Sequence, residues 1–110
     1  MGIFRSTIRM LIPLERESEA LEILGAVNEQ VRFEQGCIAS RLYRGVEDPP
    51  SIMLEQLWSS EEDALDHLRS DIYRKILLVI EMATETPEVR FDLIAKTSGL
   101  ETIEKARCES

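Results

Sequence analysis

The sequence predicts a single α+β domain whose elements follow the order strand, helix, strand, strand, helix, helix, strand. Short runs rich in β-branched and apolar residues alternate with runs in which apolar residues recur every three or four positions. Proline and glycine residues separate these runs. The length of 110 residues fits one domain, because domains are most often about 100 to 150 residues long.

The first strand and the first helix are expected in the N-terminal third of the chain. Residues 6–12 mix β-branched and apolar side chains around Arg9, and Pro13 ends this run because proline cannot donate to a sheet ladder. Residues 15–33 have helical periodicity, with apolar positions spaced by four, three and four: Ala20, Leu24, Val27 and Val31. Gly36 follows, where a left-handed residue can end a helix without a steric penalty.

A hairpin and the start of a second helix are expected next. Residues 37–46 and 51–59 are apolar, β-prone runs, and the residues between them include Pro49 and Pro50, which cannot continue a ladder. These two runs therefore predict an antiparallel pair of strands. Ser59 and Glu62 have the spacing of a capping box, which predicts that a helix begins at this point.

A third helix and a fourth strand complete the predicted domain. The helix restarts at Ser70 or Asp71, and its apolar positions share one face: Ile72, Ile76, Val79 and Ala83. Residues 89–96 alternate in the way expected of a strand with one more apolar face. We place the domain at residues 1–98 and a polar C-terminal tail, without an assigned role, at residues 99–110.

Short connections in this order predict a ferredoxin-like fold, a four-stranded antiparallel sheet with helices on one face. Apolar residues are expected on both sheet faces, namely Ile8, Met10 and Ile12 with either Met53 and Leu57 or Ile52 and Leu54. Exposed apolar area forfeits about 25 cal/mol per Å². We therefore expect two copies to pair through their sheets as a homodimer. The alternative is that the C-terminal tail covers the second face.

Charge and cysteine content narrow the expected partners and location. Acidic residues outnumber basic ones by 21 to 13, so the surface should repel nucleic acid and anionic membranes. Neither is an expected partner. The only cysteines, Cys37 and Cys108, do not suggest a disulfide framework, and the N-terminus does not read as a secretion signal. A cytoplasmic location is the expectation.

Residues 35–73 carry the most specific pattern of the chain. Gly36 and Cys37 begin a strand, Trp58 ends the next strand, and His67 follows nine residues later on a helix that leads to Tyr73. This pattern resembles the antibiotic biosynthesis monooxygenase domain family, within the dimeric α+β barrel superfamily. The resemblance implies a homodimer that oxidises a small aromatic substrate, a phenol or hydroquinone, with dioxygen and without a cofactor.

The sequence departs from the family pattern at polar positions. Many relatives have a glutamate two residues before the tryptophan, where this chain has Gln56, which cannot act as a base. Many also have a second histidine where this chain has Ile72. The haem-degrading branch carries its iron ligand at a position that is Leu77 here, which argues against haem binding by that route.

The candidate site residues follow from the resemblance together with side-chain chemistry. His67, the only histidine, is the candidate catalytic base, because its ordinary pKa lies near neutrality. Trp58 would form a wall against a flat substrate, while Gln56 and Tyr73 would supply polar contacts. The structural alternatives are a core histidine bonded to a carbonyl group and a tryptophan that is simply part of the core.

Arg41 and Tyr43 are conditional members of the substrate-binding site. If Val46 pairs with Ser51, Arg41 lies opposite Gln56, and Tyr43 also points to that face. A slip of one residue would move both side chains to the other face. Arg41 would either stabilise a substrate anion or form an ion pair with Glu55 or Asp92.

Other catalytic templates do not fit the sequence. One histidine and two distant cysteines do not supply a zinc site, and the chain has no glycine-rich phosphate loop or dinucleotide fingerprint. The sequence near His67 offers no nucleophilic serine, so it does not suggest a Ser-His-Asp triad. The second hypothesis is a non-catalytic dimer that binds a small molecule or has a structural role, because a fold does not fix a function.

Overall fold

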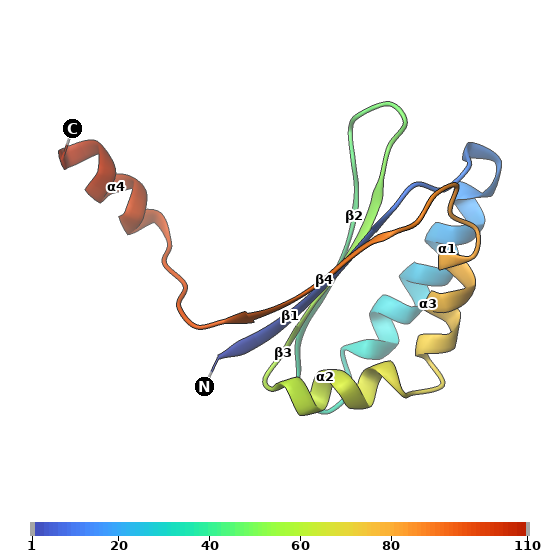
Figure 1. The fold of residues 1–110 in the computed structure, drawn as a ribbon, viewed down its shortest axis with the longest axis horizontal. Helices are drawn as coiled ribbons and strands as arrows, with labels where there is room; N and C mark the ends of the chain where they lie inside the picture. The colour runs from blue at the N-terminus through green and yellow to red at the C-terminus, as the bar shows by residue number, and fades with distance from the viewer. Residues whose placement is uncertain (1, 110) are drawn as a thin grey trace.

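The computed structural model describes residues 2–109 and has the predicted order of strands and helices, with one additional helix at the C-terminus (Figure 1). The elements are β1 (Ile3–Met10), α1 (Leu14–Val31), β2 (Cys37–Arg44), β3 (Ile52–Trp58), α2 (Glu61–Leu68), α3 (Tyr73–Ile80), β4 (Glu88–Ile94) and α4 (Leu100–Glu109). The four strands form one antiparallel sheet in the order β2-β3-β1-β4. The predicted ferredoxin-like α+β fold is confirmed.

The core lies between the sheet and the first three helices. Figure 1 shows α1, α2 and α3 together on one side of the sheet, with α4 on the other side. The predicted apolar face of α1 is fully buried, as Ala20, Leu24, Val27 and Val31 show. On β1 the even-numbered residues from Phe4 to Met10 are buried beneath the helices, because strand side chains alternate between faces.

The other side of the sheet, which we call the open face, consists of the alternate residues of all four strands. Its charged members are Arg5, Arg9, Arg41, Arg90, Glu55, Glu88 and Asp92. Its larger apolar members are Ile3, Met53, Leu57 and Ile94. Apolar side chains lie on both sheet faces, as expected, with Met53 and Leu57 on the open face. Ile8, Met10 and Ile12 instead all belong to the buried core, and charged residues dominate the open face.

The pairing of β2 with β3 differs by one residue from the register that would place Arg41 opposite Gln56. Arg41 lies opposite Glu55, and Tyr43 lies opposite Met53. Both side chains therefore belong to the open face. Burial explains this register: Ser40 is buried with its hydroxyl donating to Asn28 Oδ1 at 2.6 Å, whereas the other register would desolvate a guanidinium group.

The beginnings of β2 and α2 are fixed against each other at Gly36. This residue has the predicted left-handed conformation, with φ of +80°. A Cβ atom here would collide with the Asp63 carboxylate, and the Gly36 carbonyl accepts a hydrogen bond from the Ser59 N–H at 2.8 Å. Gly36 therefore permits the close approach that sets α2 across the end of the sheet.

Strand β4 lies at a sheet edge that the helices leave partly uncovered. Val89, Phe91 and Leu93 pair with the core residues of β1 and face the helix side. All three are nevertheless exposed, Leu93 by 68%. Phe91 stacks on Phe4 with ring centroids 6.0 Å apart. Within residues 2–109, no helix combines the length and the apolar character needed to span a membrane.

Candidate functional site

His67 is held in the core by the last turn of α2. Its side chain is 1% exposed, and its ring packs against Trp58 at a centroid distance of 4.9 Å. Trp58 ends β3 and is equally buried. Only two residues separate the end of β3 from the start of the short helix α2, so the chain folds back and places the histidine over the indole ring.

Glu34 forms the polar contact of His67. The Glu34 Oε1 atom lies 2.9 Å from Nδ1 of His67. A carboxylate can only accept hydrogen bonds, so Nδ1 is the donor in this pair, and in a neutral imidazole Nε2 is then the nitrogen with a free lone pair. A buried imidazole with a basic Nε2 is suited to remove a proton from a substrate hydroxyl group.

The sequence does not single out Glu34. This residue lies in the turn between α1 and β2, where its N–H donates to the Val31 carbonyl and its carbonyl accepts from the Cys37 N–H. It is separated from His67 by 33 positions, and no motif spacing links the two residues. A carboxylate just before Gly36 is the only sequence signal, and it becomes meaningful once the turn is known to face α2.

Of the other predicted residues, Tyr73 contacts His67 and Gln56 shares a face of β3 with Trp58. The Tyr73 ring meets His67 edge-on, with centroids 5.4 Å apart. Burial raises the pKa of the Tyr73 phenol above its ordinary value, so the group remains a neutral hydrogen-bond donor well beyond neutral pH. Gln56 lies two residues from Trp58 on the same face of β3 and is 3% exposed.

Several buried polar atoms in this region have no hydrogen-bond partner among the described residues. They are Nε2 of His67, Oε2 of Glu34 and Nε2 of Gln56. Buried polar groups are nearly always paired in folded proteins, so unpaired ones call for an explanation. These three atoms therefore retain unused hydrogen-bonding capacity.

Arg41 and Tyr43 do not join this cluster. On the open face, Arg41 forms an ion pair with Glu55 at 3.7 Å, and the Tyr43 hydroxyl donates to the same carboxylate at 3.1 Å. Glu55 is one of the two ion-pair partners expected for Arg41, and the structure contains that ion pair. The sheet separates these two residues from His67.

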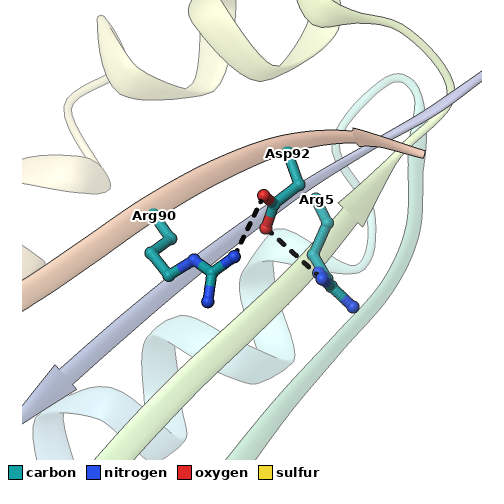
Figure 2. A network of polar contacts seen from close by, with 3 residues as sticks. All are labelled: Arg5, Arg90 and Asp92. Carbon is teal, nitrogen blue, oxygen red and sulfur yellow. Dashed lines mark hydrogen bonds and ion pairs between the residues drawn. The ribbon is translucent and has the colours of Figure 1, made fainter.

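A second ionic network crosses the open face between β1 and β4. Figure 2 shows Asp92 between the guanidinium groups of Arg5 and Arg90, at 3.3 Å and 3.4 Å. Such partly exposed ion pairs contribute little to stability. They do determine the charge that the open face presents, because each carboxylate compensates an adjacent arginine.

Metal ligation has no candidate in the part of the chain that the structure describes. Within residues 2–109, no group of three or more histidine, cysteine, aspartate or glutamate side chains is placed to hold a metal ion. His67 and Glu34 would provide two ligands, fewer than the three or four protein ligands of a typical zinc site.

Comparisons with known proteins bear on the family and the fold of the chain. The family model described as antibiotic biosynthesis monooxygenase matches residues 3–77, and the comparison with curated proteins found no match.

The fold has many relatives among solved structures. Rv0793 from Mycobacterium tuberculosis is 20% identical with a TM-score of 0.79, covering 89% of this chain and 100% of that one. A conserved protein from Methanosarcina mazei Go1 is 23% identical with a TM-score of 0.78, covering 84% and 93%. A Nitrosomonas europaea protein, named for antibiotic biosynthesis monooxygenase, is 15% identical with a TM-score of 0.79, covering 90% and 97%.

Proposed function

Because the chain belongs to the antibiotic biosynthesis monooxygenase family, we propose that it oxidises a phenol or hydroquinone with dioxygen and without a cofactor. The observation that carries the proposal is the partly buried pair of Glu34 and His67, in which the imidazole is fully buried. Glu34 holds the histidine in the tautomer with a free Nε2, and the rings of Trp58 and Tyr73 flank it. This arrangement suits deprotonation of a flat aromatic hydroxyl compound.

The proposed reaction needs only a proton acceptor and a dry site. Nε2 of His67 takes the hydroxyl proton, and Glu34 compensates the charge of the resulting imidazolium. The electron-rich substrate anion then reduces dioxygen. One oxygen atom forms a bond to a ring carbon that loses its hydrogen, and the other leaves as water. A hydroquinone thus becomes a hydroxyquinone, and the aromatic ring supplies all the electrons.

Substrate access requires a small opening of the core, because His67, Trp58 and Gln56 are each at most 3% exposed. A hollow of about 170 Å³ lies beside the end of β3 and is lined by Gly2, Ser59, Ser60, Glu61 and Leu93. It adjoins the exposed apolar edge of β4. We place the substrate entrance there, since movement of the α2 start would connect the hollow with Trp58.

The proposed active form is a homodimer that associates through the open face. The chain carries a net charge of −8, whereas the open face has four arginines and three acidic residues, a net charge of +1. The rest of the molecule therefore carries −9 and repels a second copy. Sedimentation as a lone protomer at micromolar concentration would contradict the dimer.

The second candidate function is a dimer that binds a small molecule without oxidising it. The closed state of the His67 cluster and the neutral Gln56, where many relatives carry a glutamate, favour this alternative. The free thiols Cys37 and Cys108 agree with the reducing cytoplasm, where we place either function.

Oxygen uptake separates the two candidates. The full chain is mixed with a panel of hydroquinones and phenols in the absence of flavin and metal, and an electrode records oxygen consumption. His67→Ala should lower turnover about 100-fold or more, because general-base catalysis contributes about 10²–10⁴-fold. Glu34→Gln keeps the tautomer but removes the charge, and should cost about tenfold.

The matched control is Asp66→Ala, which alters the neighbouring but exposed residue of the same helix. It should leave turnover and the dimer unchanged. Binding of the panel without oxygen uptake would support the non-catalytic candidate. Turnover by the wild type that His67→Ala leaves unchanged would remove His67 from the mechanism.

A further inference from the structure

Helix α4 stands apart from the rest of the domain. It follows an extended segment, residues 95–99, and lies on the open-face side of the sheet, away from α1, α2 and α3 (Figure 1). All its side chains from Leu100 to Cys108 are exposed. Leu100 and Ile103 are exposed by 66% and 57%, so two large apolar side chains of one helix face water.

Local hydrogen bonds define where α4 begins. The Gly99 N–H donates to Glu101 Oε1 at 2.8 Å and lowers the pKa of that carboxyl group, while the hydroxyls of Ser98 and Thr102 lie 2.6 Å apart. These contacts encode a helix start but not a stable helix. Isolated helices shorter than about 12 to 15 residues are marginal in water, and α4 has ten residues. It therefore needs a surface to pack on.

The apolar side of α4 is a stripe suited to packing. Leu100, Ile103 and Ala106 are spaced by three residues and share one face. Lys105 lies on the opposite face. We call the three residues the α4 stripe.

The overall dimensions indicate a subunit with a projecting arm. The radius of gyration is 16.0 Å, against about 13 Å expected for a compact domain of this length. The accessible surface is 7528 Å², against about 6,200 Å² for a compact monomer of this mass. The excess of roughly 1,300 Å² is comparable with the surface, about 800 Å², that each partner buries in a standard interface.

The surface that α4 meets is best supplied by a second copy of the chain. The open face is the side on which two strongly acidic protomers can approach, because its charges nearly cancel. Figure 1 places α4 on that same side, next to the space a second sheet would occupy. A copy on the open face would therefore come within reach of the α4 stripe.

We propose that α4 is an exchanged arm that packs its stripe against the second protomer of a homodimer. The proposal rests on the dimer proposed above and adds the segment that fastens it. Two-fold symmetry makes the exchange reciprocal, so each interface contains two arms. The polar tail thereby acquires a function in assembly.

A mixed dimer tests which chain α4 contacts. Burial raises the pKa of the Cys37 thiol. Replacement of this residue in Cys37→Ala makes Cys108 the single labelling site. A nitroxide-labelled Cys37→Ala chain is mixed with a ¹⁵N-labelled Cys37→Ala/Cys108→Ala chain. The expected result is loss of amide signals in the ¹⁵N chain, which can arise only from the partner's label.

The reverse sample carries nitroxide and ¹⁵N on one chain, diluted with an excess of unlabelled Cys37→Ala/Cys108→Ala protein. Signal loss confined to this sample, in a protein that sedimentation shows to be a dimer, means that α4 packs on its own chain and overturns the exchange. A protein that sediments as a lone protomer overturns the proposed dimer as well. The two failures are therefore distinguishable.

Substitutions in α4 measure the strength of the contact. Ile103→Asp places a charge in the α4 stripe of each protomer. The charge in each arm should raise the dimer dissociation constant roughly tenfold, so the two arms together should raise it about a hundredfold. The control Lys105→Gln changes the net charge by the same amount on the opposite face of the helix. It should raise the dimer dissociation constant less than about threefold. Equal dissociation constants for the two variants in sedimentation equilibrium would contradict the proposal.

Discussion

At the scale of single residues, His67 is unusual because only one of its two ring nitrogens has a partner among the described residues. A buried nitrogen left unpaired costs roughly 1–3 kcal/mol of stability. Nonpolar residues would fill the same volume without that cost. Buried ionisable groups with unmet hydrogen-bonding capacity are typical of functional sites, where a ligand completes the hydrogen bonds.

Tyr73 links this site to the stability of the fold at high pH. Burial raises its pKa above the ordinary value near 10, so the unfolded chain ionises first as the pH rises. The free energy of unfolding should therefore fall above about pH 10. In Tyr73→Phe this contribution is absent, and the fall should be shallower.

Urea unfolding of both proteins between pH 8 and pH 11, values chosen to span the ordinary tyrosine pKa of about 10, measures this difference. Cys37, whose pKa burial also raises, is common to both proteins, so it does not affect the comparison. Parallel pH profiles for the two proteins would show that Tyr73 ionises equally in the folded and unfolded chains.

At the scale of secondary-structure elements, α2 determines where His67 lies, so the start of this helix matters for the site. The sequence predicts Ser59 with Glu62 as its capping box, whereas the structure has Ser60 as the capping residue, accepting from the Asp63 N–H at 3.1 Å. The prediction is wrong by one position because consecutive serines and acidic residues make both frames possible.

Ser60→Ala should lower the free energy of unfolding by about 1 kcal/mol, since a lost N-terminal cap costs about 0.5–2 kcal/mol. Ser59→Ala is the control, because Ser59 only donates to the Asp63 carboxylate from an exposed position. Urea unfolding at one fixed protein concentration compares the two. A larger loss in Ser59→Ala would favour the capping frame read from the sequence.

Periodicity predicts the elements well but not their relative positions. The apolar spacing of α1 and the alternation of β3 are local properties, and both follow from the order of side chains. The position of Arg41 and Tyr43 depends on a one-residue choice of register, which was settled by the burial of Ser40. The contact between Glu34 and His67 depends on how two connections meet in space, and no local pattern encodes it.

At the scale of the whole molecule, the sequence predicts the fold but not the charges on its second surface. Strand order and the placement of three helices follow from short connections. The open face carries the expected apolar residues Met53 and Leu57, but also paired charges such as Arg5 with Asp92. Which residues of an alternating strand face outward depends on the helices that cover the other side, and this is a tertiary property.

The fate of the two atoms of dioxygen tests the proposed reaction most directly. The full chain is supplied with ¹⁸O₂ and a hydroquinone that it turns over, and the product is reduced at once, before its carbonyl oxygens exchange with water, and weighed by mass spectrometry. The proposed mechanism requires one ¹⁸O atom in each product molecule and one in water, with incorporation lost in His67→Ala. A quinone formed without ¹⁸O would show that dioxygen only accepts electrons, and would contradict monooxygenation at this site.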